Sequence, residues 1–166
     1  VAAHRQGHMV DATNALEDGP FGPERAGRLP AGDLVRLCFS GRYTERELIR
    51  RLTSGGGLMA HLGTRDWREV EARIAGGDPD ARLVYEAMAY QVAKEIGAMA
   101  VALRARADAI VLTGDLARSA LLTGWIAARV EWIAPVLRFP GSEEMRALAA
   151  GALRVLRGEE EARTYA

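Results

Sequence analysis

The segment DAIVLTGDLARSALLTGWIAARVEWIAPVLRFPG, residues 108–141, decides the fold class of this chain. Its β-branched run ends at Gly114 and is followed by a helical pattern over 117–130. A second short apolar run, over 133–141, also ends in glycine and precedes a helical pattern from about 143 to 156. Two strand–glycine–helix units in succession predict a parallel pair of strands joined by a right-handed crossover.

The N-terminal residues predict a different kind of strand pairing. In VAAHRQGHMVDA (1–12), Val1–His4 and His8–Ala12 flank a Gln6-Gly7 turn, which is typical of an antiparallel hairpin. A hairpin followed by a parallel pair indicates an α/β fold, a mixed sheet flanked by helices. Because residue 1 is valine and the hairpin reads as already in progress, we expect an internal start, in a fragment or a processed half.

Helices are expected between these strands. The stretch TERE (44–47) has capping-box spacing and DWRE (66–69) repeats it, while Asp78 followed by Pro79 marks a helix start. The stretch TSGGGLMAHLGT (53–64) is expected to be a glycine-rich bend. The expected helices are Asp33–Phe39, 44–52, one that begins at 66, and one long helix over 79–104.

The composition is that of one ordinary globular domain with its own core, at 166 residues, 49% apolar and 27% charged. The formal net charge of zero argues against nucleic acid or an anionic membrane as a partner. No apolar run approaches the length of a membrane span. The single cysteine, Cys38, excludes an internal disulfide and fits a reducing cytoplasm. Because its neighbours are apolar, Cys38 is expected in the core.

Ligands of open α/β sheets bind at the carboxyl ends of the strands. The stretches TGD (113–115) and PGSEE (140–144) occupy those ends here. A turn into a helix explains the glycines equally well, acidic residues suit a helix's first turn, and an N-cap explains Asp66. His4 and His8, which flank one turn, do not make a convincing metal site. The residues alone therefore indicate an α/β domain that is a candidate nucleotide binder.

Five segments spread over the chain carry a further set of motifs: DATNALEDGPFGPERAGRLPAGDLVRLCFSG (11–41), GGLMAHLGTRDWREVEARI (56–74), YEAMAYQVAKEIGAMA (85–100), AIVLTGD (109–115) and PGSEEMRALAAGALRVLRGEEEA (140–162). Together and in this order they resemble the C-terminal half of the butyrate kinase family, which is grouped with acetate kinases, sugar kinases, Hsp70 and actin. The combination is highly specific, although each segment alone is not. The resemblance implies that residues 1–158 form a C-terminal nucleotide-binding domain and that 159–166 are a frayed tail.

The resemblance implies a ribonuclease H-like domain of the actin-like ATPase type, one of two that close over a cleft. It implies transfer of the γ-phosphoryl of ATP to butyrate, giving butyryl phosphate and ADP, or the reverse reaction. ATP or ADP and Mg²⁺ are the implied cofactors, a short-chain fatty acid is the implied substrate, and a homo-oligomer is expected. Two alternatives stay open: a branched-chain fatty acid kinase of the same family, and an inactive half-protein that only binds nucleotide or dimerises.

The loop FGPERAG (21–27) aligns with the stretch that carries an active-site arginine in this family, so the resemblance implies a catalytic role for Arg25. Phosphoryl transfer depends mainly on positioned positive charge, and a guanidinium forks onto phosphate oxygens. The glycine and proline of the loop restrict its freedom. The plain alternative is a surface Arg25 paired with Glu24. Asn14 is a second catalytic candidate because it follows the hairpin close to the cleft.

Two segments are implied to bind the nucleotide, and their candidate residues are Asp66, Trp67, Arg68, Thr113, Gly114, Asp115, Leu116 and Ala117. Trp67 is expected to supply a stacking face and Arg68 a cation over the base. The family motif has two adjacent glycines after the strand, but the second position here is Asp115. A side chain there is expected to crowd the nucleotide, so Asp115→Gly is expected to tighten ATP binding or leave it unchanged.

Glu143 and Glu144 match a paired-acid stretch in which one acid helps to hold Mg²⁺, and Glu143 is preferred. Family members also carry an N-terminal domain and a glycine-rich phosphate loop directly before the segment where this chain begins. Neither is in this sequence, so the chain alone is expected to be inactive.

The superfamily's sheet order, 3-2-1-4-5, implies one more expectation. The chain is expected to supply strands 2, 3, 4 and 5 but not the central strand 1. The hairpin near Gly7 and the strand near Val111 are therefore expected not to pair directly. Since unpaired backbone groups are unfavourable in a buried sheet, the gap is expected to be filled from outside this chain, or the hairpin to be displaced.

Overall fold

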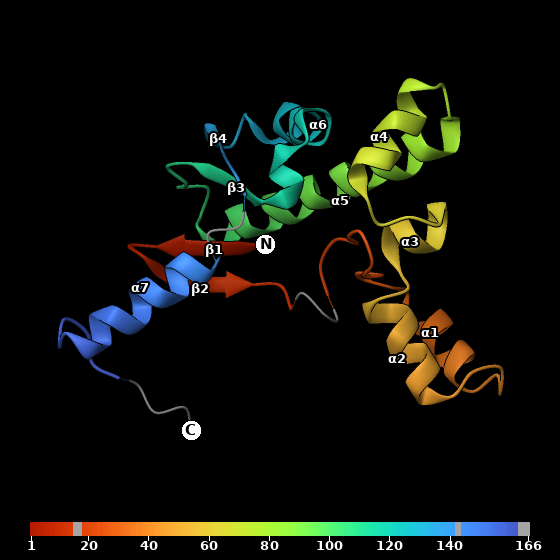
Figure 1. Cartoon of the computed structure of the whole chain (residues 1–166), viewed down its shortest axis with the longest axis horizontal. Helices are drawn as coiled ribbons and strands as arrows, with labels where there is room; N and C mark the ends of the chain where they lie inside the picture. The colour runs from red at the N-terminus through yellow and green to blue at the C-terminus, as the bar shows by residue number, and fades with distance from the viewer. Residues whose placement is uncertain (15–17, 142–143, 163–166) are drawn as a thin grey trace.

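The structure is a computed structural model that describes residues 1–14, 18–141 and 144–162. Its elements, in chain order, are β1 (Ala2–Arg5), β2 (His8–Ala12), α1 (Ala31–Cys38), α2 (Glu45–Thr53), α3 (Gly57–Leu62), α4 (Trp67–Ala75), α5 (Pro79–Ala102), β3 (Ile110–Gly114), the 3₁₀ turn η1 (Asp115–Arg118), α6 (Ala120–Val130), β4 (Val136–Pro140) and α7 (Glu144–Leu156). Figure 1 shows α5 running through the middle of this arrangement.

The strands form two separate pairs. β1 and β2 are antiparallel, and the turn between them has positive φ at Gln6 (50°) and Gly7 (78°), as a tight hairpin turn requires. β3 and β4 are parallel, with a register that runs from Ile110 opposite Val136 to Gly114 opposite Pro140. The expected fold class, a hairpin and a parallel pair flanked by helices, is confirmed.

Within the described residues the two pairs are not hydrogen-bonded to each other, as the strand order of the fold led us to expect. A groove of about 850 Å³ lies between them. It is lined by residues 1–4 at β1, 110–113 at β3, and apolar side chains of α5 and α6 that include Val92, Ile96 and Ile126. The groove between β1 and β3 is therefore mainly apolar.

The hydrophobic core is centred on α5. This helix contacts α3, α4, α6 and both hairpin strands. Its Tyr85, Met88 and Ala89 are fully or almost fully buried, and Leu58 of α3 and Val70 of α4 are buried against the same cluster. Because one helix supplies the centre of the cluster, the positions of the surrounding elements are all set relative to α5.

A buried polar cluster joins three of these elements. The Tyr85 hydroxyl oxygen lies 3.2 Å from Ser119 Oγ and 3.3 Å from Glu71 Oε1, so its one hydrogen has two acceptors within reach, and the Ser119 hydroxyl donates to Glu71. Burial raises the pKa of the Tyr85 hydroxyl, so it stays protonated. Ser119 Oγ in turn accepts from the Leu122 N–H (2.9 Å) as the N-cap of α6. The cluster thus fixes the start of α6 against α4 and α5.

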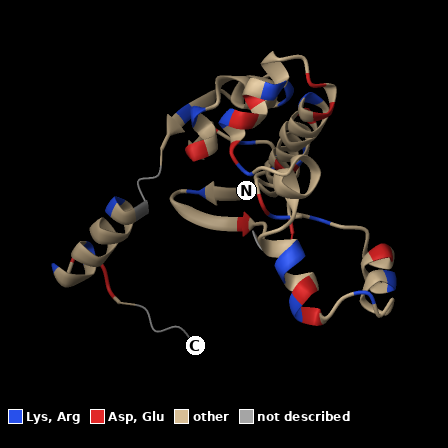
Figure 2. Ribbon diagram, turned by 45° about the vertical axis from the view of Figure 1, so that its right-hand side comes forward, with Lys and Arg blue, Asp and Glu red and all other residues tan. Residues whose placement is uncertain are grey.

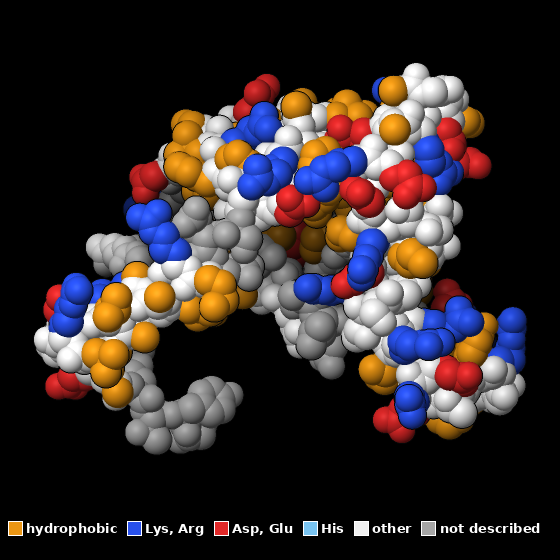
Figure 3. Space-filling view, in the orientation of Figure 1, with side chains coloured by type: hydrophobic (Ala, Val, Ile, Leu, Met, Phe, Trp, Pro, Cys, Tyr) orange, Lys and Arg blue, Asp and Glu red, His pale blue; other side chains and the backbone are white. Residues whose placement is uncertain are grey.

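Two parts of the chain lie outside this core. α1 and α2 extend on one side and α7 on the other, and α7 carries exposed apolar side chains (Figures 1 and 3). α1 buries none of its residues, and Phe39 beside it is 88% exposed. The expectation that Cys38 lies in the core is wrong: its thiol is exposed, because α1 lies outside the core and buries none of its residues.

The helix starts agree with the sequence patterns in most places. Thr44 forms the predicted reciprocal capping box with Glu47. At the second stretch with capping-box spacing, DWRE (66–69), the pairing differs. Glu69 accepts a hydrogen bond from the Thr64 hydroxyl (2.7 Å) and not from the backbone of the N-cap Asp66. α6 begins three residues later than the pattern over 117–130 suggested, because η1 precedes it.

The glycine-rich stretch 53–64 is not only a bend, as expected, but contains helix α3. Its N-terminal N–H groups are capped by main-chain carbonyls of the loop 22–24. The N–H of Gly56 donates to Glu24 O (2.9 Å), that of Leu58 to Gly22 O (3.1 Å) and that of Met59 to Pro23 O (2.9 Å). A Cβ on Gly57, whose φ is +57°, would lie 1.8 Å from the Gly22 carbonyl oxygen. Only glycine permits this approach.

We expect Gly57→Ala to lower the free energy of unfolding of the whole protein by about 2–5 kcal/mol, as measured by denaturant titration. About 1–2 kcal/mol comes from the left-handed backbone and about 1–3 kcal/mol from overpacking against the Gly22 carbonyl. Gly63→Ala is the matched control, since Gly63 ends the same helix at φ +76° with no atom within 4 Å of an added Cβ. Equal losses in the two variants would contradict the close approach as the cause.

We expect residues 1–166 on their own to self-associate or to unfold with poor cooperativity. The groove exposes apolar side chains, and in the described part of the chain β1 and β3 each present an unpaired edge to it. Sedimentation velocity and thermal unfolding measure the two properties. A monomer with one sharp unfolding transition would contradict this prediction.

Candidate functional site

The loop that carries Arg25 borders a cavity of about 580 Å³. The lining combines apolar residues, among them Phe21, Val92 and Leu116, with two arginines and two acids, which are Arg25, Arg65, Asp18 and Glu24. Such a mixture of hydrocarbon surface and guanidinium groups suits a small ligand with a short apolar part and an anionic end. Figure 3 shows an apolar recess near the middle of one face of the molecule, with basic and acidic side chains at its rim.

The backbone around Arg25 is held at several points besides the α3 contacts. The N–H of Gly22 donates to the carbonyl of Arg25 itself (3.0 Å), which closes a tight turn. The N–H of Phe21 donates to Gln91 Oε1 on α5 (3.1 Å), and that of Ala26 to the carbonyl of Leu52 (2.8 Å). The backbone that carries Arg25 is therefore already ordered by these hydrogen bonds, although the Arg25 side chain itself is exposed.

Arg65 is a cavity residue that the sequence analysis missed. Its Nη1 donates to Glu24 Oε2 (2.9 Å), so the structure pairs Glu24 with Arg65. Because Arg65 directly precedes Asp66, this ion pair links the Arg25 loop to the start of the first predicted nucleotide segment. Nothing in the local pattern identifies Arg65, because 41 residues separate it from Glu24 and only the contact between the loop and α3 brings the two together.

The first predicted nucleotide segment begins α4. Asp66 is the N-cap and accepts from the Arg68 N–H (2.9 Å). The Arg68 guanidinium lies 4.4 Å from the centre of the Trp67 ring, a cation–π contact within the segment. In this structure Arg68 thus stacks on Trp67 itself, and one face of the indole is covered by the guanidinium.

The second predicted segment lies at the carboxyl end of β3. Gly114 has φ +86°, a conformation that favours glycine, and apart from its chain neighbours no atom lies within 4 Å of an added Cβ. Gly114 and Gly141 exchange two hydrogen bonds, of 3.1 and 3.0 Å, which tie the ends of β3 and β4 together. Thr113 and Leu116 line the groove and Leu116 also lines the Arg25 cavity, while Ala117 is buried.

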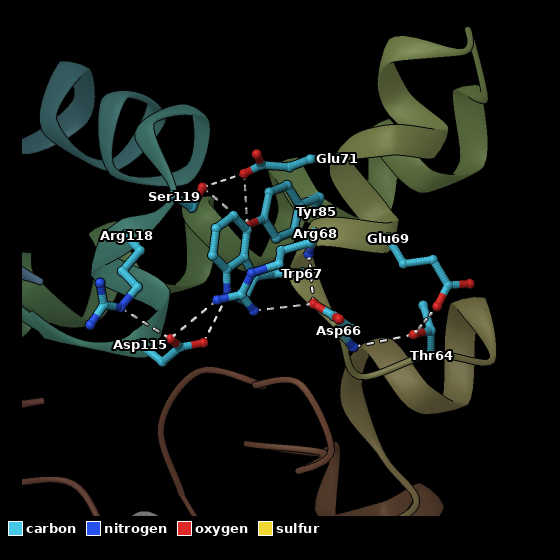
Figure 4. A network of polar contacts seen from close by, with 10 residues as sticks. All are labelled: Thr64, Asp66, Trp67, Arg68, Glu69, Glu71, Tyr85, Asp115, Arg118 and Ser119. Carbon is cyan, nitrogen blue, oxygen red and sulfur yellow. Dashed lines mark hydrogen bonds and ion pairs between the residues drawn. The ribbon is translucent and has the colours of Figure 1, made fainter. Parts of the chain in front are cut away.

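Asp115 connects the two predicted nucleotide segments (Figure 4). Its Oδ2 accepts from Trp67 Nε1 (2.9 Å), and its Oδ1 lies 3.6 Å from Arg68 Nη2 and 3.4 Å from Arg118 Nε. The Trp67 hydrogen bond, and then the two guanidinium groups, lower the pKa of the Asp115 carboxyl. Residues 48 positions apart in sequence therefore form one network beside Gly114.

The remaining predicted residues are placed less fully. Asn14 is exposed, next to Thr13, which lines the Arg25 cavity, and its carbonyl accepts from the Asp18 N–H (2.8 Å). Glu143 lies outside the described residues, as does the side chain of Glu144, the first residue of α7. Among the residues that the structure does describe, no three His, Cys, Asp or Glu side chains form a metal-binding group.

Local ion pairs, and not one broad field, set the electrostatics of this region. Figure 2 shows basic and acidic residues interspersed along the ribbon, in keeping with the net charge of zero. No helix within the described ranges is both long and apolar enough to cross a membrane.

Comparison with known proteins identifies relatives of this chain. Butyrate kinase 2 of Clostridium acetobutylicum is 51% identical over 166 residues, which is 99% of this chain and 47% of that protein. The chain thus spans about half the length of the curated relative that it matches. Acetate kinase of Porphyromonas gingivalis superposes with a TM-score of 0.74 at 20% identity, over 84% of this chain and 41% of that one. For acetate kinase of Entamoeba histolytica the values are 0.70 and 16%, over 82% and 43%.

The two superpositions show that the fold is shared, which agrees with the separate hairpin and parallel pair described above. The model of the Acetokinase family matches residues 1–124, well over half of the 166 residues. The chain belongs to the acetokinase family.

Proposed function

We propose that the protein to which this chain belongs is an ATP- and Mg²⁺-dependent kinase of a short-chain fatty acid, with butyrate as the substrate. A carboxylate oxygen of butyrate attacks the γ-phosphorus of ATP, the bond to the β,γ-bridging oxygen breaks, and butyryl phosphate and ADP are formed; the reaction also runs in reverse. The name of the Clostridium acetobutylicum relative supports the choice of butyrate. The cytoplasm is the proposed location, and a homo-oligomer the proposed assembly.

The observation that carries the proposal is the cavity lined by Arg25, by the Glu24–Arg65 ion pair and by apolar side chains. A short acyl chain suits contact with Phe21, Val92 and Leu116, while its carboxylate and the transferring phosphoryl group suit a guanidinium. Leu116 belongs to the predicted nucleotide motif, so the cavity adjoins the position proposed for ATP. The fatty acid, Arg25 and the nucleotide would then meet in one place.

Arg25 is proposed to stabilise the charge on the transferring phosphoryl group. In-line phosphoryl transfer needs little covalent assistance, so positioned cations supply most of the catalysis. The capped loop keeps the Arg25 backbone in place before substrates bind, which lowers the entropy lost on reaching the transition state. Asn14 is proposed as a polar neighbour of the same cavity, through its position next to Thr13.

Mg²⁺ usually binds proteins through one or two carboxylates together with substrate phosphates, so one glutamate suffices. Glu143 and Glu144 follow Gly141, which is hydrogen-bonded to Gly114 of the proposed nucleotide motif. In sequence, the two acids therefore follow, by two and three positions, a glycine that is bonded to the proposed nucleotide motif. Mg²⁺ would neutralise charge on the phosphates, and Glu143 is the preferred ligand.

We expect Arg25→Lys to lower kcat by about 10²–10³-fold with little change in thermal stability, because lysine keeps the charge but loses the planar fork. Coupled assays of ADP release in the full-length protein, with a panel of straight and branched acids, measure this. Arg36→Lys is the control, since Arg36 lies on α1 and pairs with Asp33 away from the cavity. A near-normal rate in Arg25→Lys would remove Arg25 from the mechanism, and a preference for branched acids would replace butyrate as the substrate.

We expect chelation of divalent cations to abolish the activity, and Mg²⁺ to restore it. Glu143→Gln should raise the Mg²⁺ concentration for half-maximal rate by at least about tenfold, while Glu144→Gln should shift it by no more than about twofold. If the two effects are exchanged, Glu144 is the ligand. If neither variant shifts the Mg²⁺ dependence, the acidic pair has no metal role.

A further inference from the structure

The carboxylate of Asp115 is the junction between η1 and α4. Three donors from these two elements converge on it: Trp67 Nε1 at 2.9 Å, Arg68 Nη2 at 3.6 Å and Arg118 Nε at 3.4 Å. Each contact alone is exposed and weak, but three donors on one carboxylate restrict its rotamers far more than one pair does. The side chain is therefore directed to Trp67 and Arg68 of α4 (Figure 4).

The Arg68 guanidinium is held on three sides. Its Nη1 lies 3.5 Å from Asp66 Oδ1, its Nη2 lies 3.6 Å from Asp115 Oδ1, and the Trp67 ring covers one face at 4.4 Å. The side chain is nevertheless 56% exposed. Since Trp67 lies on one face and the carboxylates lie at the two ends, the opposite face is where a ligand would stack. A planar cation with one accessible face is a good stacking surface for an aromatic base.

Trp67 is fixed by the same carboxylate. Its indole packs against the hydrophobic core, and its Nε1–H donates to Asp115. A tryptophan bonded at one edge and packed at the other has little freedom to rotate, so it presents a stable support for the guanidinium. Without Asp115, both the indole edge and one end of Arg68 lose their partner across the site.

We propose that Asp115 is a positioning residue that orders the Trp67–Arg68 stack as the base-facing surface of the nucleotide site. The inference rests on the proposed function, because it assumes that a nucleotide binds beside Gly114. It reverses the expectation drawn from the sequence, in which the side chain of Asp115 only crowds the nucleotide. Asp115 itself does not contact the base; it acts through Trp67 and Arg68.

The test compares Asp115→Gly, Asp115→Asn and the control Asp33→Asn in the full-length protein. Asparagine keeps an oxygen that accepts from Trp67 Nε1 but loses the charge that holds Arg68, whereas glycine loses both. Asp33 is matched because it also forms an exposed pair with an arginine, on α1. ¹⁹F NMR of 5-fluorotryptophan-labelled protein, with the Trp67 resonance assigned by Trp67→Phe, reports the order of the indole without nucleotide.

Calorimetry with ADP and with inorganic pyrophosphate separates base binding from phosphate binding. We expect Asp115→Gly to weaken ADP binding by about fivefold to tenfold and Asp115→Asn by about twofold to threefold, with pyrophosphate affinity unchanged. In steady-state assays the KM for ATP should rise by more than kcat falls. The Trp67 resonance should shift and broaden in Asp115→Gly and stay in place in Asp33→Asn.

Three results would overturn the inference. ADP affinity that is unchanged or tighter in Asp115→Gly would favour crowding, and equal weakening for pyrophosphate would place Asp115 at the phosphates. An unmoved Trp67 resonance would show that Asp115 does not order the indole. If the unsubstituted protein binds no ADP, the proposed function fails and the inference with it, whereas normal ADP binding without an Asp115 effect overturns the inference alone.

Discussion

The contact on which the candidate site depends is the capping of one short helix by the backbone of a distant loop. The carbonyls of residues 22–24 accept hydrogen bonds from the N-terminal N–H groups of α3, and this requires two bare glycines, Gly56 and Gly57. The same hydrogen bonds satisfy the orphan donors of the helix and order the loop that carries Arg25. One set of backbone contacts thus serves helix stability and the placement of a charge.

Further links extend from this contact to the rest of the site. The short helix leads directly to α4, so the Glu24–Arg65 pair forms across the junction and Trp67 comes within reach of Asp115. α5 supports the loop through the Gln91 side chain and supports α4 through the buried Tyr85 cluster. Arginines and carboxylates from three separate stretches of sequence therefore meet around a framework that is mainly backbone and core.

The sequence was sufficient for features that depend on local pattern. The hairpin turn at Gln6-Gly7, the Thr44 capping box and the start of α5 at Asp78-Pro79 each follow from a few adjacent residues, and each is present. The resemblance to a family rests on segments far apart in the chain, and it supplied the expectations that no single local pattern carries. What failed depends on tertiary contact: the helix within the glycine-rich stretch, the exposure of Cys38, and the place of Arg65 in the cavity. The sequence of a glycine run does not show whether the run is a flexible bend or a place where another stretch of backbone packs closely.

The reciprocal bridge between Gly114 and Gly141 also has a mechanical consequence. Two hydrogen bonds in opposite directions join the last residue of β3 to the residue after β4. Sliding of one strand along the other would break both of these bonds together with the β3–β4 ladder, so the bridge opposes independent movement of the two strand ends. The bridge thus gives a direct structural link from Gly141, which precedes α7 in sequence, to the turn at Gly114, in addition to the longer link through α6.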